Sequence, residues 1–301
     1  MLTPIPSPLN YTGGKFKLLP QLLPRFPAEI DTFVDLFCGG CNVGLNAEAE
    51  RVIFNDISAE LIGLYTTFQF QSPDEVFRTI EEVIETYGLS RSNVHGYAHY
   101  NCDSSKGLGP VNRDGFLRLR DACNENGPPP DSFLLFVLIV YAFNNQIRFN
   151  RRGSFNLPVG KRDFNDRMRE KLRAFLERLQ NGSYSFLCQD FRSFDPSVLT
   201  EKSLVYCDPP YLITCASYNE QGGWTEQDEL DLLAFLDGLD AKGLKFALSN
   251  VLESKGQKNT LLDDWAKQYH VVHLEHNYMN SNYQRKDKTK SADEVLIMNY
   301  R

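Results

Sequence analysis

The chain has 301 residues, of which 42% are hydrophobic and 24% are charged, and its formal net charge is −7. This length suits one large domain or two unequal ones, and the composition is that of an ordinary soluble globular protein. No apolar run is long enough to span a bilayer, and the first residues lack the basic and apolar regions of a signal peptide. We therefore expect a cytoplasmic protein with no membrane segment. The acidic balance argues against indiscriminate binding to nucleic acid.

The predicted elements form two blocks of strands separated by a helical stretch. The early strands cover residues 31–36 and 51–56, and the late ones cover 184–187, 203–207, 244–249, 270–274 and 294–299. Helical periodicity covers residues 60–70, 74–87, 132–143, 167–180 and 226–239. Strands that alternate with helices predict an α/β fold with a largely parallel sheet covered on both faces. Residues 57–165 contain no convincing buried strand and are predicted to be a helical insertion.

Before the first strand, residues 10–15 have the sequence Asn-Tyr-Thr-Gly-Gly-Lys. The glycine pair permits close approach of a ligand, and Lys15 can pair with a carboxylate. Taken alone, the segment is better explained as an exposed loop with a solvated lysine.

A glycine turn, residues 35–41, follows the first strand, and residues 43–46 are predicted to begin a helix. Glycines allow a sharp turn and close approach to a ligand. Asp56 ends the second strand about twenty residues later, where an acid can bind the ribose hydroxyls of a nucleoside cofactor. The strict dinucleotide fingerprint is absent, which disfavours nicotinamide and flavin cofactors. A Gly-Lys-Ser/Thr phosphate loop is also absent after this strand.

The seven cysteines do not resemble a disulfide framework. Cys38 and Cys41 have the Cys-x-x-Cys spacing of one half of a zinc site. Cys207 and Cys215 are too widely spaced to supply the second half. We interpret the pair as small residues in a tight turn and predict no metal.

Residues 146–173 carry nine basic residues against three acids. A local positive patch on an acidic protein is expected when one surface meets phosphates. Arg148 to Arg162 is predicted to form a β-hairpin around residues 151–154, with arginines at both ends.

The most informative stretch is Asp208-Pro209-Pro210-Tyr211, which ends the predicted strand 203–207. Two prolines stiffen the turn and leave nearby carbonyls able to accept hydrogen bonds. A carboxylate, a carbonyl and an aromatic face suit an exocyclic amine on a flat ring. The tetrapeptide alone is equally compatible with a strand that ends in a proline turn, with Tyr211 as packing.

These motifs, in this order, resemble those of the Dam-type DNA adenine-N6 methyltransferases (α group, D12 class), most closely the T-even phage branch. The resemblance covers nearly the whole chain and runs through residues 11–15, 33–40, 55–56, 148–160 and 208–211. It implies S-adenosylmethionine as methyl donor, double-stranded DNA as substrate, and a Rossmann-like sheet with an antiparallel final hairpin. It also implies a discontinuous catalytic domain, residues 1–56 and 166–301, interrupted by a target-recognition domain, residues 57–165.

The resemblance assigns roles to individual residues. Those expected to line the donor are Tyr11, Lys15, Asp35, Phe37, Cys38, Gly39, Gly40, Asp56, Asp190 and Phe191, with Lys15 near the methionine carboxylate, Asp56 on the ribose and Asp190 on the adenine. Those expected to contact DNA are Asn10, Phe143, Asn144, Gln146, Arg148, Asn150, Arg151, Arg152, Pro158, Lys161 and Arg162. Arg148 and Arg162 are assigned to base contacts, since arginine pairs bidentately with guanine, and Lys161 to phosphate. The implied target is GATC. Cys41 stands where many relatives have a third glycine.

The expected chemistry is positioning and charge stabilisation. Asp208 and the Pro209 carbonyl accept both hydrogens of the adenine N6 amine, which directs its lone pair toward the methyl group. The adenine has to be flipped out of the duplex and stacked, most simply on Tyr211.

Two other hypotheses remain from the residues. One is an amino-methyltransferase of the same fold that acts on RNA or on a protein glutamine, although the glutamine enzymes have Asn in place of Asp208. The other is a non-catalytic DNA-binding relative, which would be expected to have lost at least one of Lys15, Asp56, Asp208 and Tyr211.

Overall fold

A computed structural model of the chain describes residues 3–103, 105–125, 127, 129–214, 223–275 and 292–301. The chain divides into two compact units, which are described separately. The helical unit comprises Met1–Phe16, Gly39–Leu45 and Ser58–Cys188. The sheet unit comprises Lys17–Cys38, Asn46–Ile57 and Gln189–Arg301.

The strands of the sheet unit lie in the order β2-β1-β4-β5-β8-β7. Their bounds are β1 Thr32–Asp35, β2 Arg51–Asp56, β4 Leu204–Cys207, β5 Lys245–Ser254, β7 His270–His273 and β8 Asp293–Met298, with a short β6 at Gln257–Lys258 paired to β5. The pairs β1–β2, β1–β4 and β4–β5 are parallel, whereas β8 runs antiparallel to both β5 and β7. The predicted α/β fold, with its mostly parallel sheet and antiparallel final pair, is confirmed.

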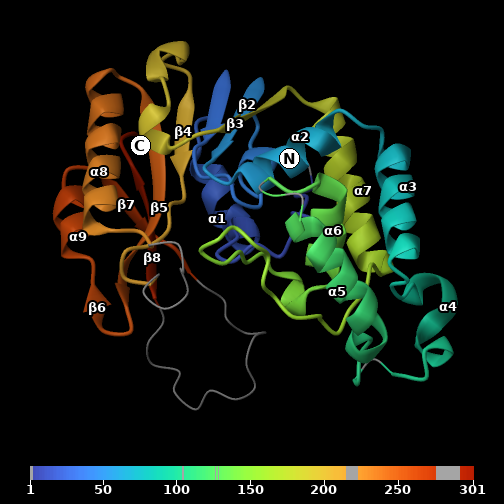
Figure 1. Ribbon diagram of the computed structural model, residues 1–301. Coiled ribbons are helices and arrows are strands. Elements are labelled where there is room, and N and C mark those ends of the chain that lie inside the picture. The colour runs from blue at the N-terminus through green and yellow to red at the C-terminus, as the bar shows by residue number, and fades with distance from the viewer. Residues whose placement is uncertain (1–2, 104, 126, 128, 215–222, 276–291) are drawn as a thin grey trace. The chain divides into compact units, whose positions relative to one another are not determined.

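Burial on both faces explains why apolar residues follow one another without alternation in the central strands, at Phe33-Val34 of β1 and throughout β4. Every residue of β1 and β4 is buried, as expected for strands covered on both faces. The helices α8 (Glu226–Ala241) and α9 (Thr260–Ala266) pack against β5, as Figure 1 shows in orange. The N-terminal elements η1 (Lys15–Leu18), α1 (Leu19–Leu22) and η2 (Leu23–Arg25) precede β1.

The helical unit is built around α6 (Ser132–Tyr141), in which eight residues are buried. It contacts α2 (Ala59–Gln69), α3 (Pro73–Thr86) and α5 (Gly109–Glu125). The unit also contains α4 (Ser92–His99), α7 (Asp166–Asn181) and β3 (Tyr184–Cys188). Ser72 and Glu75 form a reciprocal capping box at the start of α3, which accounts for that helix boundary.

The predicted strands and helices are confirmed to within a few residues, apart from two differences. Residues 43–46 form only a 3-10 turn, Gly44–Asn46, because β2 begins at Arg51 and leaves no room for a longer helix. The helix predicted to reach Phe143 ends at Tyr141, since Ala142 is extended with ψ 163° and cannot continue it. The functional division at residues 57 and 165 stays a prediction.

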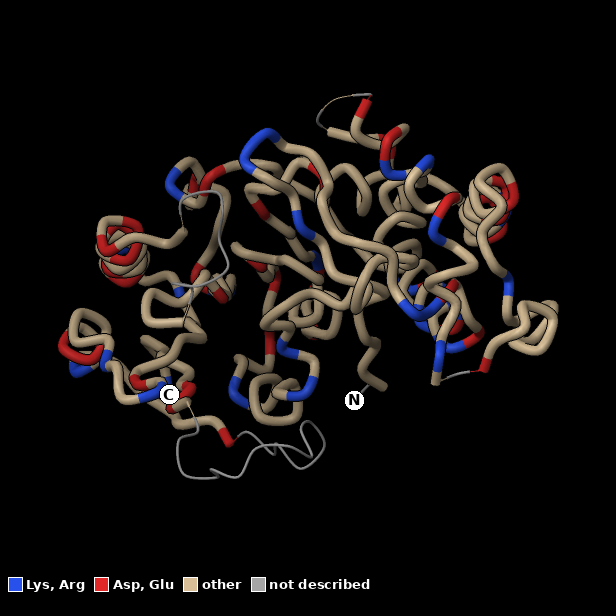
Figure 2. The backbone as a smooth tube through the Cα atoms, turned by 60° about the horizontal axis from the view of Figure 1, so that its bottom comes forward, with Lys and Arg blue, Asp and Glu red and all other residues tan. Residues whose placement is uncertain are grey.

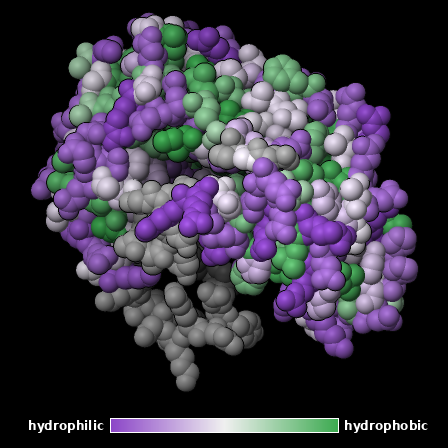
Figure 3. Space-filling view, in the orientation of Figure 1, coloured by the Kyte–Doolittle hydropathy of each residue, from purple (hydrophilic) through white to green (hydrophobic). Residues whose placement is uncertain are grey.

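Acidic and basic residues are interspersed along both units (Figure 2). The face in Figure 3 presents mainly hydrophilic side chains on α3, α4 and α5. Within the described ranges, no helix is both long and apolar enough to cross a membrane.

A buried carboxyl organises the start of α8 in the sheet unit. Glu229 is fully buried, and its Oε2 accepts from Trp224 Nε1 at 2.6 Å. Its Oε1 accepts from the side-chain amides of Asn259 at 2.9 Å and Asn250 at 3.3 Å. Burial raises the pKa of Glu229 above its ordinary value, although these three donors oppose the shift. All three partners donate, so a side chain that only accepts is required here.

We predict that Glu229→Gln changes the pH dependence of stability. A carboxyl with a raised folded pKa stabilises fully below its ordinary pKa of 4.5, and that contribution is lost as pH rises through the folded value. The glutamine amide does not titrate, so this pH dependence of the unfolding free energy disappears. Its NH2 group also faces hydrogen-bond donors, which lowers the unfolding free energy by about 1–3 kcal/mol. Urea denaturation of both proteins at several pH values measures both effects. Glu226→Gln, an exposed neighbour in the same helix turn, is the control and should keep the wild-type slope.

Candidate active site

The carboxyl ends of β1 and β4 lie side by side in the sheet unit. Asp35 is the last residue of β1 and is aligned with Tyr206 of β4 on one side and with Phe54 of β2 on the other. Asp35 is 2% exposed, and Asp56, the last residue of β2, is 9% exposed. Because β1 continues to β2 on one side and neighbours β4 on the other, the strand order reverses here, where open α/β sheets bind ligands.

One residue of β2, Asn55, bonds to the loops that follow two other strands, β1 and β3. Its Nδ2 donates to the carbonyls of Leu36 at 3.0 Å and Gln189 at 3.1 Å, and its own carbonyl accepts from Cys38 N at 2.8 Å. The loops after β1 and β3 are thereby joined to the end of β2. The Oδ1 of Asn55 is buried and has no hydrogen-bond partner among the described residues. Such an acceptor costs about 1–3 kcal/mol unless a water or a ligand hydrogen reaches it.

In the helical unit, the N-terminal segment packs on the glycine turn. A Cβ on Gly39 would lie 2.6 Å from Cε1 of the Tyr11 ring, so only glycine fits under that ring. Ser7 N donates to Asn42 Oδ1 at 3.0 Å, and a Cβ on Gly40 would meet Ser7 Oγ at 3.2 Å. The predicted donor residues Tyr11, Gly39 and Gly40 are thus brought together.

Lys15 and Cys41 are both buried. Lys15 is 5% exposed, and its Nζ donates to Gly13 O at 2.9 Å, so it is not the solvated lysine of an exposed loop. Cys41 is buried with φ 58°, the left-handed conformation that favours glycine. The position of the missing third glycine therefore still has the backbone that glycine would adopt, at the cost of strain.

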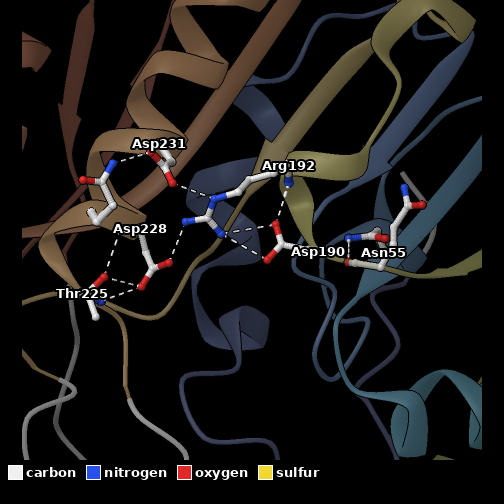
Figure 4. A network of polar contacts seen from close by, with 8 residues as sticks. Asn55, Asp190, Arg192, Thr225, Asp228 and Asp231 are labelled. Carbon is white, nitrogen blue, oxygen red and sulfur yellow. Dashed lines mark hydrogen bonds and ion pairs between the residues drawn. The ribbon is translucent and has the colours of Figure 1, made fainter.

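In the sheet unit, Asp190 and Arg192, which follow β3 along the chain, belong to a network of polar contacts (Figure 4), and an aromatic cluster lies beside it. Asp190 accepts from Arg192 N at 2.8 Å, and its carboxylate also pairs with Arg192 Nη1 at 3.1 Å. Phe191, which is buried, lies 5.4 Å from Phe37 between ring centroids, and Trp224 lies 5.8 Å from both. The predicted residues Phe37, Asp190 and Phe191 therefore form one cluster.

Arg192 also reaches α8. Its Nη2 donates to Asp228 at 2.6 Å and its Nε to Asp231 at 2.7 Å. Partial burial alone would lower the pKa of Arg192, but the hydrogen bonds that it donates to these carboxylates and to Asp190 raise it above its ordinary value. Arg192 thus remains charged throughout the physiological range.

The tetrapeptide after β4 is arranged around Asp208. The Tyr211 hydroxyl donates to Asp208 Oδ1 at 2.8 Å and lies 3.4 Å from Glu294 Oε1 of β8. Burial, together with the charges of Asp208 and Glu294, raises the pKa of Tyr211 well above its ordinary value, so the phenol stays protonated. Pro209 is buried and Pro210 is exposed. The ring of Tyr211 is held beside the carboxylate by its own hydroxyl.

The basic segment of the helical unit reverses direction around residues 150–154. Asn150 Oδ1 accepts from the backbone of Arg152 at 2.9 Å and of Ser154 at 3.1 Å, and Gly153 has φ 77°. Isolated antiparallel bridges join Phe149 to Phe155 and Ala142 to Val159, so the predicted hairpin has its turn but no regular strands. The side chains of Arg148, Arg151, Arg152, Lys161 and Arg162 are exposed.

Two consecutive left-handed residues precede this segment. Asn144 has φ 55° and Asn145 has φ 53°, and Phe143 beside them is 47% exposed. Asn10 Nδ2 donates to Asn144 O at 3.3 Å, which joins the N-terminal segment to this turn. Gln146 is partly buried and Pro158 is exposed, and Phe143 N donates to Pro158 O at 2.9 Å.

The basic patch predicted over residues 146–173 is not a single open surface. In α7, Arg169 pairs with Glu81 and stacks on Phe164, and Arg173 lies 3.7 Å from Asp74. These two arginines are paired with acids of α3 and contribute to packing within the helical unit. The exposed basic side chains of residues 148–162, and exposed Arg167 of α7, remain as the phosphate-binding candidates.

A family model matches residues 11–280, and its description is D12 class N6 adenine-specific DNA methyltransferase. The chain belongs to this family. It is 43% identical over 303 residues to the type II methyltransferase M.FokI of Planomicrobium okeanokoites and 42% identical over 304 residues to the modification methylase StsI of Streptococcus sanguinis. These alignments cover 98% of the chain but only 43% of either relative, so the chain spans less than half of their length. The DNA adenine methylase of Escherichia coli K12 is 25% identical over 297 residues, with 96% of the chain and 94% of that protein covered.

Sequence patterns alone do not identify several residues that the structure brings to the candidate site. Trp224, Arg192 and Glu294 join the site through contacts with partners that are between 36 and 187 positions away along the chain. No local pattern identifies them. The one available sign was that Trp224 immediately precedes a Thr-x-x-Asp capping box at the start of α8. In the described part of the chain, no group of three metal-ligating side chains occurs.

We predict that Asp56→Ala weakens binding of a nucleoside donor. A carboxylate at the end of β2 can accept from ribose hydroxyls, and each such charged hydrogen bond contributes about 1.5–3 kcal/mol. Calorimetric titration with S-adenosylmethionine measures the change. Asp195→Ala, which alters a carboxylate bonded to Ser197 in the same unit, serves as the control. An unchanged dissociation constant for Asp56→Ala would remove this residue from the site.

Proposed function

We propose that the protein transfers a methyl group from S-adenosylmethionine to N6 of a flipped adenine in double-stranded DNA. The observation that carries the proposal is the arrangement of Asp208 and Tyr211 at the carboxyl end of β4, next to the end of β1, in a chain of the D12 class. When bound, S-adenosylmethionine supplies an electrophilic methyl group on a sulfonium.

The residues after the strands fit a donor of this kind. The rings of Phe37, Phe191 and Trp224 provide flat apolar faces for an adenine. The buried acceptor of Asn55 lies among the same loops, and the carboxylates of Asp35 and Asp56 suit hydroxyl and ammonium groups. Tyr11, Lys15, Cys38, Gly39, Gly40 and Asp190 complete the proposed donor set, with Lys15 assigned to the methionine carboxylate.

The catalytic groups act on the target amine. Asp208 and the Pro209 carbonyl accept its two hydrogens, which localises the nitrogen lone pair for attack. The Tyr211 hydroxyl holds one Asp208 oxygen at 2.8 Å, which fixes the carboxylate while the ring offers a face for stacking. The nitrogen loses its proton after it has become cationic, so no base with a shifted pKa is needed before attack. Catalysis is positioning plus charge stabilisation.

On the DNA side, we propose that Arg148 and Arg162 contact bases and that Lys161 contacts phosphate. Asn10, Phe143, Asn144, Gln146, Asn150, Arg151, Arg152 and Pro158 are assigned to the same interface. The candidate target is GATC, and the resemblance to the T-even phage branch likewise remains a proposal. The names of the modification methylase relatives support a role in restriction-modification.

Asp208→Ala tests the proposed reaction. The variant is expected to lower methyl transfer by at least about 10²-fold, as when one electrostatic group of an active site is removed. Its donor affinity should change little, because Asp208 is assigned to the substrate. The assay is methylation of random-sequence DNA with the modified positions read by sequencing, which also reveals the target. Tyr211→Phe, which keeps the ring but not the hydroxyl, should retain more activity. Near-normal turnover by Asp208→Ala would refute the mechanism.

Arg162 and Lys161 are neighbours assigned to different tasks. Arg162→Ala should reduce discrimination at one base position by about 1–3 kcal/mol, because base edges carry sequence information. Lys161→Ala should weaken binding to all DNA sequences alike. It should also reduce the slope of log affinity against log salt concentration by about one. Methylation rates on the target and its single-base variants at several salt concentrations distinguish the two. Equal, sequence-independent losses in both variants would exclude Arg162 as a base reader.

A further inference from the structure

Arg192 connects two segments that each contribute a ring to the aromatic cluster. It follows Phe191 directly, and its guanidinium lies 4.5 Å from the centroid of that ring. Its bonds to Asp228 and Asp231 cross 36 and 39 residues to the first turns of α8. Figure 4 shows the side chain extended from the loop after β3 toward that helix. The contact joins the loop that carries Asp190 and Phe191 to α8.

The start of α8 in turn positions Trp224. Asp228 accepts from the backbone of Thr225 at 2.9 Å, so the residue that Arg192 binds also caps the helix. Trp224 precedes that cap, and its ring touches both Phe37 and Phe191. Fixing Asp228 therefore fixes the tryptophan against the other two rings.

The contact between the loop after β3 and α8 depends on the charge of Arg192. Asp190, Asp228 and Asp231 all bind the single guanidinium, and their side chains are 39%, 27% and 34% exposed. A single ion pair at such exposure contributes little, but three carboxylates share this cation. Without it they would repel one another across the gap between the loop after β3 and α8.

We propose that Arg192 is a positioning residue for the methyl donor: by clamping α8 to the loop after β3 it closes the aromatic cluster of Phe37, Phe191 and Trp224 on the donor's adenine. The inference rests on the proposed function, since it takes the adenine of S-adenosylmethionine as the ring that the cluster receives. Lysine can replace arginine only in part, because its ammonium keeps the charge but lacks the planar fork that reaches three carboxylates at once.

The test uses Trp224 as a reporter. The chain has two tryptophans, so Trp265→Phe leaves Trp224 as the only one. In that background, S-adenosylmethionine and S-adenosylhomocysteine are titrated by fluorescence into the parent, Arg192→Gln, Arg192→Lys and Asp231→Asn. Arg51→Gln is the matched control, since Arg51 bonds Thr32 and Val198 at the opposite end of β2.

Arg192→Gln is expected to weaken both ligands by roughly ten-fold or more, Arg192→Lys by less, and Asp231→Asn by at most about five-fold. Salt should restore part of the affinity of Arg192→Gln but not of the parent, as the Debye length falls from about 10 Å to about 3 Å. The KM for the donor should rise, with kcat at saturating donor and the KM for DNA little changed.

Three outcomes would overturn the proposal. One is parent-like donor affinity in Arg192→Gln, another is a loss without salt rescue, and the third is an equal loss in Arg51→Gln. Should Arg192→Gln fail to fold, Arg192→Lys and Asp231→Asn decide by the same measurements. A parent protein that binds neither ligand would instead refute the proposed function, so the two failures are distinguishable.

Discussion

The carboxyl edge of the sheet depends on one buried amide, that of Asn55. Its two side-chain hydrogens satisfy the carbonyls of Leu36 and Gln189, and its backbone carbonyl receives the amide of Cys38. A carboxylate has no hydrogens to donate there, and an aliphatic side chain would leave two buried carbonyls unsatisfied. The loops after β1 and β3 are consequently held to the end of β2 by the protein itself, before any ligand contributes.

Charge is distributed so that an acidic protein can act on a polyanion. Carboxylates gather at or after the strand ends, at Asp35, Asp56, Asp190 and Asp208, where the proposed donor is a sulfonium cation. Five exposed basic side chains lie instead between residues 148 and 162. A net charge of −7 therefore coexists with a local attraction for phosphate, because screening confines each group's influence to about 10 Å or less at physiological salt.

The segment with the exposed basic side chains, residues 148–162, follows a turn with unusual backbone geometry. Asn144 and Asn145 are both left-handed, which costs about 1–3 kcal/mol for each non-glycine residue in such a conformation. A Cβ on Gly160 would lie 2.3 Å from Ala142 O, so the returning chain passes this turn at a distance that only glycine permits. Strain that persists in a turn next to exposed Phe143 is consistent with a functional constraint there.

The sequence by itself determined the order of the strands along the chain, the helical insertion and the chemistry of the main motifs. Burial on both faces requires continuous apolar runs such as Phe33-Val34 and Leu204 to Cys207, and such runs can be recognised in the sequence. The family resemblance could also be recognised from the sequence, because motifs such as Asp208 to Tyr211 are contiguous.

Only the tertiary structure decided which side chains support those motifs. Asn55, Arg192, Trp224, Glu229 and Glu294 act through partners that lie far away in sequence or in other elements, and such pairings leave no periodic pattern. The same is true of Arg169 and Arg173, which the sequence places in a basic run but which α3 neutralises. Composition counts charges, whereas the fold determines which charges are already paired: a hydrogen bond or ion pair depends on distances of about 3–4 Å that chain order does not specify.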